Sequence, residues 1–292
     1  MPIEFAKLHG AGNDYIYVNC LEGLPVPDAR LFELARAVAE RHRGVGADGL
    51  ILVLPPPDDT VAFGFRMFNS DGSEGEMCGN GMRCFARYVW ENGLIRRTEF
   101  AVATAAGPIQ CWLTPGEASA PWSVTCDLGP PRLAPASVPT TLVADEAGYV
   151  RDRPFQLGGR RFLLTAVSTG VPHAVIFVDD PESLPWRELG RAIEDHAAFP
   201  QRTNVEFVQV LAEDRAQAYV WERGSGETLA CGTGACAVAV AGAITGRLGR
   251  EVVVGLPGGD LGVEWREADD HVLLSGPAAL VCTGVFVLPA AE

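Results

Sequence analysis

The chain has 292 residues, of which 48% are hydrophobic and 21% are charged, as expected of a folded globular protein. Its formal net charge of −14 argues against an electrostatic hold on nucleic acid or anionic lipid. No apolar run reaches the ~18 residues of a membrane span, and the N-terminus lacks the apolar stretch of a signal peptide. We therefore expect a cytoplasmic protein that binds neither nucleic acid nor membrane.

Cysteine and lysine usage narrows the chemistry further. The eight cysteines are irregularly spaced and form no Cys-x-x-Cys pair, which disfavours both a disulfide framework and a zinc ribbon. Lys7 is the single lysine among the 23 basic residues, and it lies in a predicted terminal strand. Because a pyridoxal-phosphate enzyme needs a lysine for its Schiff base, this cofactor is disfavoured, and we expect no cofactor and no metal.

The first half of the chain predicts two helices around two strands. A helix over 31–38 has an apolar stripe and can be capped by Asp28. Apolar residues over 50–54 and alternation over 61–67 predict strands. A polar loop then leads to Cys78-Gly79-Asn80-Gly81, followed by helical spacing of apolar residues over 82–90 and a helix stop at Gly93.

The second half repeats this order. Ser183 can cap a helix over 189–193, strands are predicted over 205–211 and 216–221, and a loop leads to Cys231-Gly232-Thr233-Gly234. A helix over 235–243 follows and stops at Gly246. The two cysteines are 231 − 78 = 153 residues apart, about half the chain.

This repeat predicts an α+β fold of two pseudo-symmetric domains. Each domain is expected to be a mostly antiparallel sheet or barrel wrapped on a central helix, with the active site in the cleft between them. The predicted first domain covers residues 1–122 and is joined by a C-terminal strand in 277–292, and the second covers 123–276. Chance similarity of two glycine-rich turns is the alternative.

Cys78 and Cys231 stand out among the cysteines because each precedes a predicted helix. A helix N-terminus offers unpaired N–H groups that favour thiolate, and the glycines after each cysteine let a bound carboxylate approach. If the two helix starts meet, one sulfur lies on each face of an α-carbon, which is the arrangement that stereochemical inversion needs. The remaining six are interpreted as packing residues: Cys20, Cys84, Cys111, Cys126, Cys236 and Cys282.

Other patterns carry less weight. Cys78 and Cys84 are six residues apart, about 240° around a helix, and Cys231 and Cys236 are five residues apart and diverge similarly, so a metal site is excluded there. The Gly44–Gly49 match to G-x-G-x-x-G has a strand after it rather than before it, which excludes a dinucleotide site.

The remaining candidates are single polar residues. His173 is expected on a turn. The adjacent Glu222 and Arg223 are as consistent with a clamp that binds a ligand as with an ion pair on the surface. From spacing alone Asn13, Asn69 and Asn204 read as turn residues.

The sequence closely resembles the diaminopimelate epimerase family. The resemblance rests on blocks in family order over nearly the whole chain, and those around the two cysteines are highly specific. These blocks are Lys7–Tyr15, Phe68–Ser73, Met77–Cys84, Arg202–Asn204 and Glu222–Thr228 running into Ala230–Gly234. The resemblance implies cofactor-independent interconversion of LL- and meso-2,6-diaminopimelate, for lysine and cell-wall precursor synthesis, by a homodimer.

The resemblance also implies roles for single residues. In the LL-to-meso direction Cys231 would be the proton acceptor and Cys78 the proton donor, and the backbone at Gly79, Asn80, Gly232 and Thr233 would bind the reacting carboxylate. His173 and Glu222 would orient the reacting ammonium group. The remaining substrate contacts would come from Asn13, Asn69, Asn204, Glu222 and Arg223, with Arg223 suited to a bidentate grip on the distant carboxylate.

Two positions depart from the family pattern. Val171 stands where many members have the asparagine of Gly-Asn-Pro-His, and Gly49 stands where some have glutamine. Both bear on recognition of the substrate's distant end. Two alternatives stay open: a racemase of another amino acid, of the proline or histidine type, on the same scaffold, and a non-catalytic amino-acid-binding protein, which would not need two thiols.

Overall fold

The computed structural model describes residues 2–116 and 122–288. The chain forms two compact units, Met1–Cys126 together with Gly276–Glu292, and Asp127–Ser275. The predicted domains were 1–122 with 277–292, and 123–276; residues 1, 117–121 and 289–292 of that prediction lie outside the described residues. That the two units are homologous epimerase domains stays a proposal.

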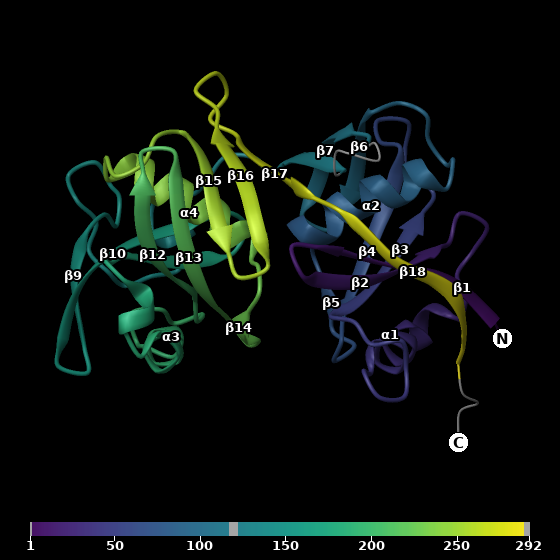
Figure 1. Cartoon of the computed structure of the whole chain (residues 1–292), viewed down its shortest axis with the longest axis horizontal. Coiled ribbons are helices and arrows are strands. Elements are labelled where there is room, and N and C mark those ends of the chain that lie inside the picture. The colour runs from purple at the N-terminus through teal and green to yellow at the C-terminus, as the bar shows by residue number, and fades with distance from the viewer. Residues whose placement is uncertain (1, 117–121, 289–292) are drawn as a thin grey trace. The chain divides into compact units, whose positions relative to one another are not determined.

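The first unit is built mainly of strands. Its helices are a 3₁₀ turn η1 (Asp28–Arg30), α1 (Leu31–Ala39) and α2 (Gly79–Glu91). Its strands are β1 (Pro2–Gly10), β2 (Asn13–Asn19), β3 (Gly49–Leu54), β4 (Phe63–Asn69), β5 (Glu74–Gly75), β6 (Glu99–Thr104), β7 (Gly107–Thr114), β8 (Ser123–Asp127) and β18 (Ala279–Val287). The chain thus returns at its C-terminal end, where β18 runs antiparallel beside β1 (Figure 1).

The second unit has the same kinds of element. Its helices are the 3₁₀ turns η2 (Pro135–Ser137) and η3 (Pro181–Ser183), with α3 (Trp186–Glu194) and α4 (Gly232–Ile244). Its strands are β9 (Arg153–Leu157), β10 (Arg160–Ser168), β11 (Pro172–Phe177), β12 (Asn204–Ala212), β13 (Arg215–Glu222), β14 (Gly226–Thr228), β15 (Glu251–Leu256), β16 (Gly259–Trp265) and β17 (Val272–Pro277).

The strand pairings repeat from one unit to the other. The order β18-β1-β2-β3-β4-β6-β7-β8 in the first unit matches β9-β10-β11-β12-β13-β15-β16-β17 in the second. In each order the third strand is parallel to the fourth and the fifth to the sixth, and the other pairs are antiparallel. The mostly antiparallel α+β fold predicted from the sequence is confirmed.

A helix lies on each face of each sheet. In the first unit the α1 stripe packs on Leu50 and Leu52 of β3, while Ile51, between them in sequence, reaches the first turn of α2. In the second unit α3 packs on Val205 and Phe207 of β12. Helix α4 covers the other face, and ten of its 13 residues are buried, as expected of a central helix.

The starts of the two outer helices differ from the prediction. Helix α1 has Arg30 at its N-cap with no side-chain cap, and the Asp28 carboxylate instead pairs with Arg66 at 2.5 Å. Helix α3 has Pro185 at its N-cap, and Ser183 Oγ donates to the Asp180 carbonyl at 2.7 Å. Both capping predictions were wrong because a 3₁₀ turn precedes each helix and contains the expected cap residue.

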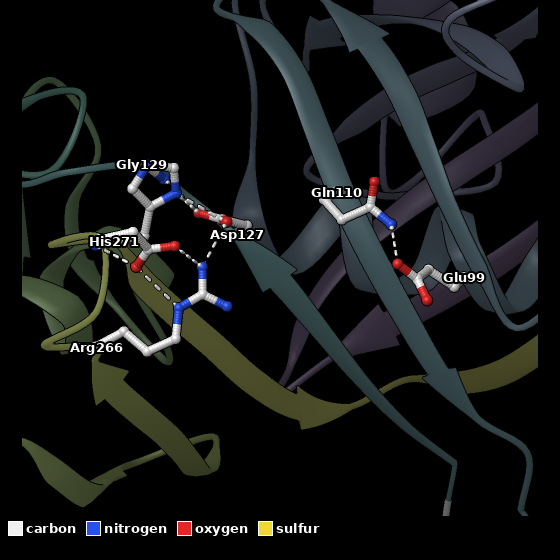
Figure 2. Close-up of polar contacts among 7 residues, drawn as sticks. Glu99, Gln110, Asp127, Gly129, Arg266 and His271 are labelled. Atoms are coloured by element: carbon white, nitrogen blue, oxygen red, sulfur yellow. Dashed lines mark hydrogen bonds and ion pairs between the residues drawn. The ribbon is translucent and has the colours of Figure 1, made fainter.

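Asp127 ties down the chain where the second unit begins. Its carboxylate contacts His271 Nδ1 at 2.9 Å and Arg266 Nη2 at 3.3 Å, and accepts the Gly129 N–H at 2.8 Å (Figure 2). Arg266 and His271 lie in the segment that joins β16 to β17, so these two contacts fix the first residue of the unit against its last hairpin.

Candidate active site

Cys78 is the N-cap of helix α2. Its backbone is extended, at φ −135° and ψ 121°, and its Sγ accepts the Gly81 N–H at 3.4 Å. This is the role that a Ser or Asp side chain plays at other helix starts, here performed by sulfur. The helix dipole and the N–H contact both favour the thiolate form of this half-buried cysteine.

Amide side chains surround Cys78. The thiol donates to Asn13 Oδ1 at 3.5 Å, and the buried Asn80 amide donates to the same oxygen at 3.4 Å. Asn13 in turn donates to Asp48 at 2.6 Å, and Arg83 holds the Asn80 oxygen at 2.8 Å. Cys78, Asn13 and Asn80, three residues expected in the site, are therefore brought together within the first unit.

Cys231 is the N-cap of helix α4 in the same conformation. Its φ and ψ are −114° and 112°, and its Sγ accepts the Gly234 N–H at 3.3 Å. The Thr233 hydroxyl lies 3.4 Å from the sulfur, and the Thr233 carbonyl accepts from Thr169 at 2.9 Å. Cys231 is more deeply buried than Cys78.

Three ionisable side chains accompany Cys231. His173 and Glu206 are fully buried, and His173 Nδ1 lies 2.7 Å from Glu206 Oε1. Glu222 accepts from the Thr228 hydroxyl at 2.5 Å and hydrogen-bonds Cys231. Burial raises the pKa of both carboxyl groups, and hydrogen bonds to His173 and Thr228 respectively oppose that shift.

The same surroundings act on the thiol of Cys231. Burial is the main cause that raises its pKa well above the ordinary value of 9.0, and the nearby charges of Glu222 and Glu206 add to it. The Thr233 and Gly234 contacts pull in the opposite direction. The resulting thiolate is a strong base, held next to a carboxyl group whose own pKa is raised.

The other expected substrate residues have mainly local partners. Asn69, the last residue of β4, donates to Ser73 Oγ at 3.0 Å. Asn204, the first residue of β12, accepts the Arg223 N–H at 2.7 Å, and the exposed Arg223 guanidinium donates to the Gln201 carbonyl at 3.1 Å. Gly79 and Gly232 are the first residues of α2 and α4, so their N–H groups belong to the unpaired first turn.

Several expectations about individual residues change. His173 is the second residue of β11 rather than part of a turn. Cys282, expected to be buried, is exposed on β18. At Gly49 a Cβ would lie 2.1 Å from the Phe68 carbonyl oxygen, so the backbone leaves no room there for a larger residue.

Glu206 was missed by the sequence analysis. It lies inside the apolar run Val205–Val208 that predicts a buried strand, and its only sequence signal was that a charged residue interrupts that run. A buried carboxylate needs a partner, so such an interruption points to a paired or functional side chain.

The single lysine has two close oxygen partners. Lys7 Nζ is held by the Asp14 carboxylate at 2.7 Å and the Gly46 carbonyl at 2.5 Å. Among residues 2–116 and 122–288, no three His, Cys, Asp or Glu side chains group closely enough to hold a metal ion. No helix of that part of the chain is long and apolar enough to cross a membrane.

The sequence matches the family model described as diaminopimelate epimerase over residues 5–134 and 165–281. Among similar proteins, one from Halothermothrix orenii is 46% identical over 99% of both chains, and one from Moorella thermoacetica is 48% identical over 98% of this chain and 100% of its own. Both carry the name diaminopimelate epimerase.

Solved structures of lower identity share the fold. A phenazine biosynthesis protein from Bacillus anthracis superposes with a TM-score of 0.71 at 14% identity, covering 98% of this chain and 99% of its own. A hydroxyproline epimerase from Agrobacterium vitis gives 0.67 at 16% identity, covering 98% and 91%. At these identities the likeness extends to the fold alone.

Proposed function

The chain belongs to the diaminopimelate epimerase family, and we propose that it interconverts LL- and meso-2,6-diaminopimelate by moving a proton between Cys78 and Cys231. The observation that carries the proposed mechanism is the repeated helix start, in which a cysteine caps each of two equivalent helices through a sulfur contact to an N–H three residues on. Neither a cofactor nor a metal takes part.

The reacting carboxylate binds to the two helix starts. The N–H groups of Gly79 and Asn80 and of Gly232 and Thr233 lie in the first turns of α2 and α4, and two positive dipole ends then act on one anion. These fixed donors also stabilise the negative charge that develops when the α-proton leaves. Each such donor lowers the free energy of the transition state by about 3 kcal/mol. This lowers the barrier for removing a very weakly acidic proton.

The thiols move the proton. In the LL-to-meso direction Cys231 thiolate takes the α-proton and becomes thiol, while Cys78 thiol delivers its proton to the opposite face and becomes thiolate. The roles exchange in the reverse direction. The proton count belongs to the pair, because one thiol and one thiolate are required at the start of each turnover. The raised pKa makes Cys231 thiolate a strong base toward the α-proton, while the same shift favours the thiol form of Cys231 before the proton pair is set.

His173 and Glu222 orient the reacting ammonium group. Both side chains belong to the second unit near Cys231, and the partly buried Glu222 carboxylate is a suitable charged acceptor for an ammonium. An ammonium group in that position also stabilises the charged form of the neighbouring carboxylates, because it offsets the loss of their hydration on burial.

The distant half of the substrate is held by amides and an arginine. Asn13, Asn69 and Asn204 supply amide groups, and the exposed Arg223 guanidinium suits a second carboxylate. That second carboxylate distinguishes diaminopimelate from proline or histidine, so Arg223 favours diaminopimelate over the racemase alternative. Val171 offers no amide here, so the distant end depends on the remaining groups.

The working form is a cytoplasmic homodimer. An apolar row on β18 supports a second copy of the chain as its partner, because this end strand of the first unit's sheet exposes Leu280, Val281, Val285 and Val287. A Val285→Glu change is expected to shift the molecular mass measured by light scattering from that of two chains toward that of one. A monomeric wild-type protein would contradict the homodimer.

The activity is tested by incubating the protein with a panel of amino acids in D2O and following the α-protons by NMR. We expect LL- and meso-diaminopimelate to lose the signal of the reacting α-proton as the stereocentre inverts, because the incoming proton comes from a thiol that has exchanged with solvent. Exchange of proline or histidine instead would favour the racemase alternative. Binding of diaminopimelate without exchange would indicate a binding protein.

A further inference from the structure

Glu206 is a buried carboxylate to which the mechanism gives no role. Its side chain is fully shielded from solvent, and so is that of His173, whose Nδ1 lies 2.7 Å from Glu206 Oε1. His173 Nε2 and Glu206 Oε2 are both buried, and within the described part of the chain neither has a hydrogen-bond partner. The contact with Glu206 therefore fixes His173 Nδ1, whereas His173 Nε2 can bind another group.

The strand registers place these groups on the face of the sheet that carries α4. His173 of β11 pairs with Asn204 of β12, and Glu206 follows two residues later on the same face. A Cβ at Gly234, in the first turn of α4, would lie only 2.9 Å from Glu206 Oε1. The glycine thus lets the helix start that carries Cys231 pack directly over the carboxylate.

The equivalent position of the first unit holds a different residue. Tyr15 of β2 pairs with Gly49 of β3 as His173 pairs with Asn204, and two residues later the first unit has Ile51. Ile51 meets the first turn of α2 as Glu206 meets that of α4, since a Cβ at Gly81 would lie 2.7 Å from Ile51 Cδ1. The fold therefore accepts an aliphatic residue here, and packing does not require a carboxylate.

Burying a charge without need destabilises a protein, so Glu206 calls for a role beyond packing. We propose that Glu206 is a positioning residue for the epimerase: its carboxylate holds the His173 ring as the Nδ1–H tautomer, so that Nε2 offers a lone pair to the reacting ammonium group. This inference rests on the proposed function, in which His173 orients that group.

The proton arrangement follows from the short distance. Nitrogen and oxygen acceptors 2.7 Å apart need a hydrogen between them, and a carboxylate that accepts this hydrogen from the ring leaves it on Nδ1. In the opposite tautomer the unprotonated Nδ1 would face the carboxylate, and their lone pairs would repel each other. The ionisable groups from the elements packed around this pair are Cys231 of α4 and Glu222 of β13.

The tautomer is measured directly by nitrogen-15 NMR of the histidine rings at about pH 8, with His173 assigned from a His173→Gln sample. The expected wild-type spectrum shows His173 with a protonated Nδ1 and an unprotonated Nε2. In Glu206→Gln the amide can also donate to Nδ1, so we expect a population with protonated Nε2. Ile51→Val, at the equivalent position of the first unit, is the matched control and should leave the His173 signals unchanged.

Steady-state kinetics provide a second test of the role of Glu206. Glu206→Gln is expected to lower kcat about 10- to 100-fold with a smaller change in KM, the scale typical of losing a partner that orients a ligand-binding histidine. A wild-type His173 with protonated Nε2, or a Glu206→Gln protein with unchanged tautomer and unchanged kcat, would overturn the proposal. The tautomer is read without substrate, so a failure of the epimerase assignment would appear separately, as absence of turnover.

Discussion

The helix starts at Cys78 and Cys231 share a backbone but differ in charge. Both cysteines are extended N-caps whose sulfur accepts the N–H three residues on, at 3.4 Å and 3.3 Å. The Cys78 thiol donates to a neutral amide, that of Asn13, whereas Cys231 lies near the carboxylates of Glu222 and Glu206. In the proposed mechanism the repeated backbone binds a carboxylate, and the side chains make the two thiols unequal.

Equivalent strand positions explain how this difference arises. Where the first unit has Tyr15, Ile51 and Asn69, the second has His173, Glu206 and Glu222. Each replacement exchanges a group that is uncharged at neutral pH for a carboxylate or an imidazole. A symmetric fold can therefore carry an asymmetric acid–base pair without any change in its strand order.

The largest expected effect is the loss of either sulfur. Cys78→Ala and Cys231→Ala should each lower kcat about 100- to 10,000-fold, because each removes one partner in proton transfer. The matched controls are Cys84→Ala and Cys236→Ala, buried one to two turns further along the same helices, which should reduce stability by about 1 kcal/mol and leave most activity. If the controls lost as much activity as the N-cap variants, the sulfurs would not be the reacting groups.

A second change tests whether the carboxylates act on Cys231 alone. Glu222→Gln should lower the pKa of the Cys231 thiol, since a nearby negative charge that raises it is removed. It should also reduce kcat/KM about 10- to 100-fold by weakening the ammonium contact. The measurement is the pH dependence of iodoacetamide labelling, read at each cysteine by peptide mass mapping. Cys78 in the same sample is the internal control, and an equal shift at both cysteines would contradict the local effect.

A third change tests the difference between Gly49 and its counterpart Asn204. Gly49→Ala should lower the free energy of unfolding by about 1–3 kcal/mol, because its Cβ would lie 2.1 Å from the Phe68 carbonyl oxygen and backbone must move. Gly249→Ala is the control, since its nearest contact would be 3.7 Å, and it should change stability little. Chemical denaturation measures the free energy of unfolding of both variants. Equal values would show that the backbone of β3 and β4 can move apart at little energetic cost.

The smallest effect is expected in how stability depends on pH. Glu206 and Glu222 have pKa values raised above 4.5 in the folded state, so their protonation favours folding at low pH and that contribution is lost as pH rises above 4.5. Burial opposes but does not outweigh the ion pairs with Lys7 and Arg41, which lower the pKa of Asp14 below 3.8. Its contribution is present above pH 3.8 and is lost as pH falls further.

The Tm of the wild type and two variants, followed from about pH 3 to about pH 8, separates these contributions. Glu206→Gln should flatten the decline above 4.5, and Asp14→Asn should flatten the decline below 3.8. A Glu206→Gln curve that keeps the wild-type slope above 4.5 would mean that the Glu206 pKa is not raised on folding.

Much of this architecture could be predicted from sequence because it follows from local patterns. Cys-Gly-x-Gly before helical spacing predicts both central helix starts, and the repeated element order predicts an α+β fold in two halves. The helix caps at Asp28 and Ser183 could not be predicted, since 3₁₀ turns contain both residues. Glu206 was missed because pairing across strands, not sequence proximity, brings it to His173.

The account depends on Cys78 and Cys231 meeting across one α-carbon, and mapping disulfides after mild oxidation with diamide tests this most directly. We expect a peptide that links Cys78 to Cys231, with activity lost on oxidation and restored by dithiothreitol. The buried thiols of Cys111 and Cys126, 3.9 Å apart, are the competing pair. Loss of activity with only Cys111 linked to Cys126, or full activity with Cys78 linked to Cys231, would contradict the account.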